Sequence, residues 1–193
     1  MTLYKNKYRI ESARCPHWDY TSNGYYFVTI CTHNRQHFFG NVIAGKMQLS
    51  DIGVIVAQEW QKTPHLRPNV QLDEWVVMPN HFHGIIIINN PEETFRINNS
   101  EKTFRRNVSK NNKSRLQPNS LGSIIGQFKS VCTKQIRKIG FTDFRWQTRF
   151  HDHIIRDEKS LQRIRQYIIN NPAKWELDRN NCTNIRDVPT KPF

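Results

Sequence analysis

The segment HFHGIIII, residues 81–88, constrains the fold of this chain more than any other stretch. Four isoleucines in a row predict a β-strand that enters a hydrophobic core. Because side chains alternate between the two faces of a strand, His81 and His83 share one face with the first and third isoleucines. The two imidazoles therefore point the same way from the start of a buried and rigid element.

Three other segments are expected to be strands. Residues 71–78 form a hairpin with the histidine-bearing segment, because Pro79 presets the φ angle of a turn and Asn80 tolerates the next turn position. Residues 25–31, YYFVTIC, are rich in β-branched and aromatic side chains, and residues 148–156, TRFHDHIIR, are expected to be the last strand. The chain thus carries four strand segments, two of which are joined by a tight turn.

Three segments have the apolar spacing of helices. Residues 50–64 repeat apolar side chains at four-residue steps after a capping serine or aspartate, and Pro64 is expected to end that helix. Residues 120–140 carry an apolar stripe that stops at Gly140, a residue suited to a C-terminal cap. Residues 157–172 begin with an aspartate that can cap a helix, and they end at a proline.

The order of these segments is β-α-β-β-α-β followed by one more helix. It predicts an α+β fold with ferredoxin-like topology, in which an antiparallel sheet has helices on one face and its first and third strands are central. The additional C-terminal helix carries the candidate tyrosine discussed below. We expect a basic N-terminal arm (1–24), one domain (25–177) with a flexible basic insertion (89–119), and a C-terminal tail (178–193).

Charge and composition narrow the class of protein. Lys and Arg number 29 against 16 Asp and Glu, a formal charge of +13, which favours a polyanionic partner such as nucleic acid. No segment is long and apolar enough to span a membrane, and the N-terminus lacks a secretory signal, so a cytoplasmic protein is expected. The four cysteines are scattered without a C-x-x-C pair, which argues against a zinc knuckle or a disulfide framework. The sequence contains no glycine-rich phosphate-binding motif, so no nucleotide cofactor is expected.

The paired histidines are candidate metal ligands. Two imidazoles at positions i and i+2 of a strand can converge on one divalent ion, which could bind a scissile phosphate and orient its leaving group. The alternative is that His81 and His83 are half-buried histidines with ordinary hydrogen bonds. A second pair, His151 and His153, has the same spacing on another strand, and spacing alone does not choose between the pairs.

Tyr167 is a candidate nucleophile on the last helix. It lies at the margin of the apolar stripe, with Asn170 and Asn171 three and four residues later on the same face. A phenol has a pKa of about 10 and attacks phosphorus well only if a cation stabilises the developing charge. The alternatives are that Tyr167 is a packing residue and that the asparagines simply end the helix.

Three separated segments resemble the REP-associated tyrosine transposases, which belong to the single-tyrosine HUH transposases. They are GYYFVTICTHNRQHFFG (24–40), MPNHFHGIIII (78–88) and RFHDHIIRDEKSLQRIRQYIINNPAKW (149–175). HUH denotes histidine, a hydrophobic residue and histidine, and residues 81–83 fit that motif. The likeness covers roughly residues 8–177 apart from the insertion, with the motifs in the family's order.

The resemblance implies a reaction. Family members cut single-stranded DNA at hairpin-associated sequences with Mg²⁺ or Mn²⁺, and a tyrosine becomes joined to a 5′ phosphate while a 3′ hydroxyl is released. The phosphotyrosine ester retains the energy of the broken bond, so DNA can be rejoined without ATP.

The resemblance also assigns roles to residues of this chain. It implies that His81 and His83 are metal ligands and that Tyr167 is the nucleophile. The third ligand of the family lies one helical turn after the tyrosine, which indicates Asn171 in preference to Asn170. His151 and His153 match a segment to which the family assigns no metal, so they are expected to be structural or to contact DNA.

Basic side chains are expected to hold the DNA through its phosphates, in a cytoplasmic, nucleoid-associated protein that is a monomer rather than a homodimer. The candidates are Lys5, Lys7, Arg9 and Arg14 in the arm, Lys129 and Arg137 on the second long helix, and Arg145, Arg149, Arg163 and Arg165 nearer the tyrosine.

Two other functions fit the same sequence. One is a non-catalytic nucleic-acid-binding module that keeps the fold and the charge. The other is a hydrolytic, metal-dependent nuclease in which Tyr167 only packs. Both differ from a strand transferase in the fate of the tyrosine, because neither forms a covalent bond between protein and DNA.

Overall fold

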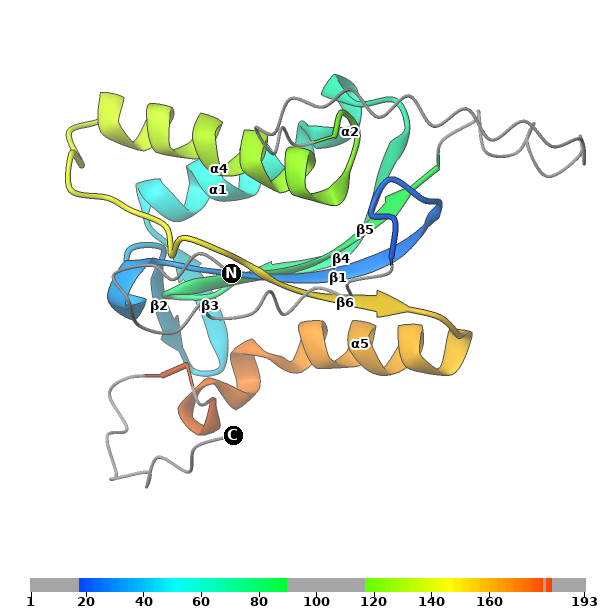
Figure 1. Cartoon of the computed structure of the whole chain (residues 1–193). Coiled ribbons are helices and arrows are strands. Elements are labelled where there is room, and N and C mark those ends of the chain that lie inside the picture. The colour runs from blue at the N-terminus through cyan, green and yellow to red at the C-terminus, as the bar shows by residue number, and fades with distance from the viewer. Residues whose placement is uncertain (1–17, 90–116, 179, 182–193) are drawn as a thin grey trace, which may run out of the picture.

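The structure, a computed structural model, describes residues 18–89, 117–178 and 180–181. Its centre is a four-stranded antiparallel sheet (Figure 1). The strands, in spatial order, are β4 (Val70–Val77), β5 (His81–Ile88), β1 (Gly24–Cys31) and β6 (His151–Ile155). The first and third expected strands, β1 and β5, are central, as predicted.

The predicted hairpin is confirmed. Pro79 and Asn80 connect β4 to β5, and the Met78 N–H donates to the carbonyl of His81 at 2.8 Å. Because β5 pairs with β1 on its other side, from Gly24 opposite Ile88 to Cys31 opposite His81, it is hydrogen-bonded on both edges. The strand that carries the histidine pair is therefore one of the most constrained elements of the protein.

Helices cover both faces of the sheet (Figure 1). On one face lie α1 (Asp51–Gln61), the short α2 (Thr63–Leu66) and α4 (Leu121–Lys138). On the opposite face lies α5 (Glu158–Asn170), which the 3-10 turn η3 (Pro172–Leu177) follows. This arrangement confirms the ferredoxin-like α+β fold with a further C-terminal helix.

Two local expectations differ from the structure. Residues 32–49, for which the sequence predicted no element, contain the 3-10 turn η2 (His33–Arg35) and a separate hairpin of β2 (Gly40–Ile43) and β3 (Lys46–Leu49). Pro64 does not end the first helix, because α1 stops at Gln61 and Pro64 lies in the first turn of α2. A proline is tolerated there, since the first helical N–H groups have no partner within the helix.

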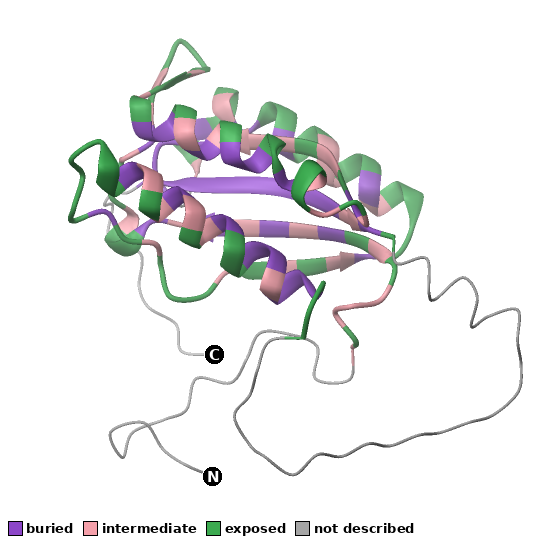
Figure 2. Cartoon of the chain, turned by 90° about the horizontal axis from the view of Figure 1, so that it is seen from above, coloured by how far each residue is buried: buried purple, intermediate pink, exposed green. Residues whose placement is uncertain are grey.

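The main core lies between the sheet and α1 and α4. Trp60 of α1 packs its ring 4.5 Å from that of Phe82 and 5.2 Å from that of Phe128, measured between centroids. Gly84 leaves the space that the Trp60 ring fills, because a Cβ atom there would come within 2.7 Å of it. In Figure 2 the strand under the helices is coloured as buried along nearly its whole length, in agreement with the burial of β5.

A second and smaller core lies under α5. Its buried members are Ile85, Ile155, Leu161 and Ile168, with Phe27, Val76 and Ile164 partly buried around them. Ile85 lies on the face of β5 that also carries His81 and His83, as the alternation predicted. The small core therefore holds α5 over the histidine pair.

Several predicted regions fall wholly or partly outside the described residues. Residues 1–17 of the expected arm, with Lys5, Lys7, Arg9 and Arg14, lie outside them, as do 90–116 of the insertion and most of the tail. At the end of the arm, Trp18 and Tyr20 pack against the main core. Among the helices of the described residues, none is long and apolar enough to cross a membrane.

Candidate active site

The histidine pair lies at the buried start of β5. His81 is 0% exposed and His83 is 2% exposed, and their ring centroids are 4.5 Å apart. Burial, followed by the nearby Arg35 and His37, lowers the pKa of His81 to about 3. Burial, and then the proximity of His81, also lowers the pKa of His83 well below its ordinary value. Both imidazoles are therefore neutral near pH 7, and each has a nitrogen lone pair that can bind a cation.

Asn80 determines which nitrogen of His81 carries the proton. Its side-chain Nδ2 donates to two carbonyl oxygens, of Arg35 at 3.1 Å and of Asn180 at 2.7 Å. The amide oxygen of Asn80 must then be the atom 2.8 Å from Nδ1 of His81. Since an amide oxygen only accepts, Nδ1 of His81 donates and the lone pair of the neutral ring lies on Nε2.

That Nε2 atom is buried and has no hydrogen-bond partner within the described part of the chain. A buried acceptor without a partner lowers the stability of the fold by roughly 1–3 kcal/mol. The desolvation of this nitrogen has therefore already taken place on folding, and its lone pair is available to a ligand. A hydrogen bond that holds the other ring nitrogen is the usual second contact of a metal-binding histidine.

His83 is held by β1 and faces the tyrosine. Its Nδ1 lies 2.8 Å from the hydroxyl of Thr29, and the ring of Phe27 stacks on its imidazole at a centroid distance of 5.3 Å. Its Nε2 lies 3.2 Å from the hydroxyl of Tyr167. The structure therefore brings the predicted nucleophile and a predicted ligand into direct contact.

Tyr167 reaches the site from α5. Its ring packs edge-on against Phe27 with centroids 6.1 Å apart, and 46% of the residue is exposed. The phenol therefore combines a defined position at the histidine pair with access from solvent.

The end of α5 and the following turn η3 each place an aromatic ring beside one of the two histidines. Tyr167 contacts His83, and the ring of Trp175 in η3 lies 5.9 Å from that of His81. Asn171, midway between them in the chain, is 3% exposed, and its Oδ1 has no partner among the described residues. Asn170 is exposed. Of the two asparagines, the burial and the open oxygen single out Asn171.

These atoms suit a divalent cation. They supply an unpartnered imidazole nitrogen, a second imidazole that contacts the tyrosine, and an unpartnered amide oxygen. Nitrogen ligands suit Mn²⁺ better than Mg²⁺, whereas the amide oxygen suits both. Among the described residues, no group of three or more His, Cys, Asp or Glu side chains is placed so that it could hold a metal ion.

The rival histidine pair has different surroundings. His151 and His153 lie on the edge strand β6, opposite Thr29 and Phe27 of β1, and both are exposed. They are thus on the face of the sheet that carries the candidate site, but without its burial. The two pairs have the same spacing and differ in the depth at which the fold holds them.

The predicted DNA-contacting residues lie on both faces of the sheet. Lys129 and Arg137 line a groove along α4, opposite the tyrosine, with Lys134 and Lys138 beside them. The ammonium group of Lys129 is partly engaged, since it donates to the carbonyl of Gln147 at 2.6 Å. Arg145, Arg149 and Arg163 are exposed, whereas Arg165 is half-buried and is paired with Asp73. Their contact with DNA stays a prediction.

Sequence reasoning did not find four residues that shape the site. Asn80 was interpreted only as a turn residue, and Thr29, Phe27 and Trp175 were not singled out. All four stand in segments that carried the family resemblance, but their positions in the sequence do not reveal that they contact the histidines. The alternation of β1 could have placed Phe27 and Thr29 on one face, yet not opposite His83.

The architecture is that of a known class of DNA-processing protein. The solved structure of a REP-associated tyrosine transposase bound to a REP hairpin covers 93% of this chain and 77% of its own chain, at 19% identity and a TM-score of 0.50. A transposase candidate from Deinococcus radiodurans R1 covers 81% of this chain and 95% of its own, at 10% identity and a TM-score of 0.44. The chain has the fold of the REP-associated tyrosine transposases, as the sequence resemblance implied.

The chain belongs to the same family as a protein of Haemophilus influenzae strain Rd. That protein, described as uncharacterised, is 40% identical over 168 residues, which make up 87% of this chain and 91% of the relative. No protein-family model matches the chain.

Proposed function

We propose that this protein is a transposase-like enzyme that nicks and joins single-stranded DNA at hairpin-associated sequences through a covalent bond to Tyr167. The observation that carries the proposal is the contact of the Tyr167 hydroxyl with Nε2 of His83, at 3.2 Å, next to His81, whose ring lies 4.5 Å from that of His83 and whose buried Nε2 is unpartnered among the described residues. Asn171, four residues after Tyr167, has a buried Oδ1 that is likewise unpartnered there. The fold of a transposase that is bound to a REP hairpin, together with the charge of +13, supports DNA as the substrate.

His81, His83 and Asn171 would hold a Mn²⁺ or Mg²⁺ ion. When bound, such an ion supplies charge neutralisation at the scissile phosphate and at the attacking oxygen. The chain contributes the rest: β5 fixes the two imidazoles, Asn80 keeps the Nε2 lone pair of His81 free, and burial keeps both rings unprotonated. Each of these features favours cation binding near neutral pH.

In the proposed step, the Tyr167 oxygen attacks the phosphorus and forms an O–P bond. The bond from phosphorus to the 3′ oxygen breaks, and that oxygen leaves with the electron pair. The phenol releases one proton to water and the 3′ oxygen gains one from water, so the step is balanced. The 5′ phosphate stays on the protein, and attack by another 3′ hydroxyl reverses the bonding and rejoins DNA.

The test is a covalent adduct with labelled DNA. A hairpin-bearing single strand from the repeats that flank the gene carries one dye at its 3′ end and another at its 5′ end. With Mn²⁺, wild-type protein should migrate with the 3′ dye on a denaturing gel, and the 5′ dye should appear on a free shorter strand. EDTA should abolish both products.

The matched control is a second exposed tyrosine. Tyr167→Phe should abolish the adduct while leaving DNA binding intact, and Tyr25→Phe, on β1, should retain it. Absence of the adduct in the wild-type protein with all such hairpins would favour the non-catalytic binding module. Cleavage that survives in Tyr167→Phe would favour the hydrolytic nuclease.

A further inference from the structure

The helix that carries Tyr167 rests on the sheet through a narrow apolar row. Leu161, Ile164 and Ile168 supply that row, and of these only the first and last are buried. A single row fixes where a helix lies but resists rotation about the helix axis only weakly. Contacts on the flanks of the row must therefore set that rotation, and with it the position of the tyrosine.

Arg165 and Tyr167 lie on opposite flanks. At about 100° per residue, two residues are separated by about 160° around the helix. Tyr167 extends over the central strands to His83, whereas Arg165 extends the other way to Asp73 on the edge strand β4. The two side chains thus hold the helix from both sides.

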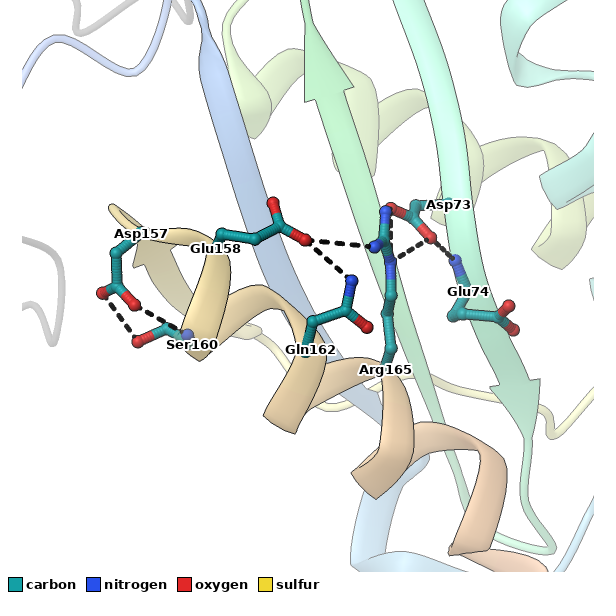
Figure 3. Close-up of polar contacts among 7 residues, drawn as sticks. All are labelled: Asp73, Glu74, Asp157, Glu158, Ser160, Gln162 and Arg165. Atoms are coloured by element: carbon teal, nitrogen blue, oxygen red, sulfur yellow. Dashed lines mark hydrogen bonds and ion pairs between the residues drawn. The ribbon is translucent and has the colours of Figure 1, made fainter.

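Arg165 and Asp73 form an ion pair of defined geometry, which we call the lock (Figure 3). Its Nη2 donates to one carboxylate oxygen of Asp73 at 2.6 Å, and its Nε lies 3.1 Å from both oxygens. The backbone N–H of Glu74 donates to the same carboxylate at 2.7 Å. Asp73 is 12% exposed and Arg165 28% exposed, so the pair is partly shielded from water. Bidentate arginine–carboxylate pairs of this kind fix orientation as well as supplying energy.

A β-bulge delivers Asp73 to this position. Between Leu72, opposite Ile86, and Trp75, opposite Gly84, β4 contains one more residue than β5. Leu72 and Trp75 both pack against the main core, whereas Asp73 bonds to the helix on the other face. Bulges re-aim side chains in this way and are frequent beside functional sites.

The charges of the pair are maintained in the fold. Burial raises the pKa of Asp73, but the hydrogen bonds from Arg165 and from the Glu74 backbone outweigh it, and the net pKa lies below the ordinary value. Glu158, about two turns earlier on α5, approaches Nη1 of Arg165 at 3.7 Å and is exposed. Asp73 is therefore the principal partner of the guanidinium.

We infer that Arg165 and Asp73 are positioning residues that set the rotation of α5 and thereby the place of the Tyr167 hydroxyl. The inference rests on the function proposed above, and it gives Arg165 a role other than the predicted contact with DNA. A roll of about 10° moves an atom at the helix surface, about 6 Å from the axis, by about 1 Å. A misplacement of that size can slow a reaction by about 100-fold.

The experiment compares Asp73→Asn and Arg165→Gln with Lys159→Gln. The control removes a positive charge from an exposed position of the same helix. Adduct formation is followed in single turnovers at saturating hairpin DNA, and the Kd for DNA is measured by anisotropy. Both lock variants should react about 10- to 100-fold more slowly with Kd unchanged within about 2-fold. Lys159→Gln should react at the wild-type rate.

A double variant tests whether the two residues act together. Asp73→Asn combined with Arg165→Gln should be no slower than the slower single variant, because the lock is already broken by either change. A role of Arg165 in DNA binding would instead raise Kd in Arg165→Gln and leave Asp73→Asn at the wild-type rate. That pattern would overturn the inference.

A second readout needs no reaction. In protein labelled with ¹³C in its tyrosine rings, the resonance of Tyr167 is identified by its loss in Tyr167→Phe. It should shift in both lock variants and stay in place in Lys159→Gln. This readout decides the positioning role even if wild-type protein forms no adduct, an outcome that would count against the proposed function alone. An unmoved resonance in both lock variants would refute the positioning role.

Discussion

Acid should destabilise this protein through its buried histidines, His81 and His83, and the contribution of His81 can be worked out. The pKa of His81 is about 3 in the fold, against 6.5 for an ordinary histidine, chiefly because of burial. Below pH 6.5 the unfolded chain binds a proton that the folded chain does not, so the free energy of unfolding falls as the pH is lowered towards 3. Between about pH 7.5 and about pH 4.5 this one residue should remove roughly 3 kcal/mol of stability.

The assay is urea unfolding at a series of pH values in EDTA, followed by tryptophan fluorescence. His81→Gln removes the titrating group, so its stability should fall by roughly 3 kcal/mol less than that of the wild type over the same range. His65→Gln, which replaces an exposed histidine of α2, should follow the wild-type curve. Parallel curves for the wild type and His81→Gln would refute the reasoning, because they would mean that the fold does not keep His81 neutral.

Two other predictions concern packing and the ion. Gly84→Ala should lower the free energy of unfolding by about 1–3 kcal/mol in urea titrations, because the added Cβ would lie 2.7 Å from the ring of Trp60. An unchanged free energy of unfolding would show that the core around Trp60 shifts to accommodate the added methyl group. Mn²⁺ at about 100 times its Kd should stabilise the wild type by about 2.7 kcal/mol and should raise its melting temperature. Asn171→Ala should lose most of that rise, and an equal rise in both proteins would exclude Asn171 as a ligand.

Much of this fold follows from local patterns. The alternation in β5 placed His81 and His83 on the face that also carries Ile85, and the helical spacing of α1, α4 and α5 identified the other layers. The β2–β3 hairpin was not predicted because its strands have four residues each and are largely exposed, so no apolar alternation marks them. Short surface strands form where tertiary contacts support them rather than where propensity is high.

The candidate site was only partly predictable. Motifs named its two histidines, its tyrosine and its asparagine, since these types have recognisable chemistry. Asn80 acts through carbonyl groups of Arg35 and Asn180, which lie 45 and 100 residues away in the chain. Asp73 depends on a one-residue bulge in β4. Contacts of this kind are set by the register of paired strands and by loops that close in space, which no local pattern contains.

The unequal size of the two cores determines which part of the molecule can open first. Detaching α5 exposes a small cluster around Ile85 and Ile168, whereas removing α4 would expose the aromatic packing around Trp60. Free energies of partial unfolding scale with such contacts, so the amide protons of α5 should exchange with solvent well before those of α4. The layer that bears Tyr167 can thus loosen while the opposite layer keeps the domain folded.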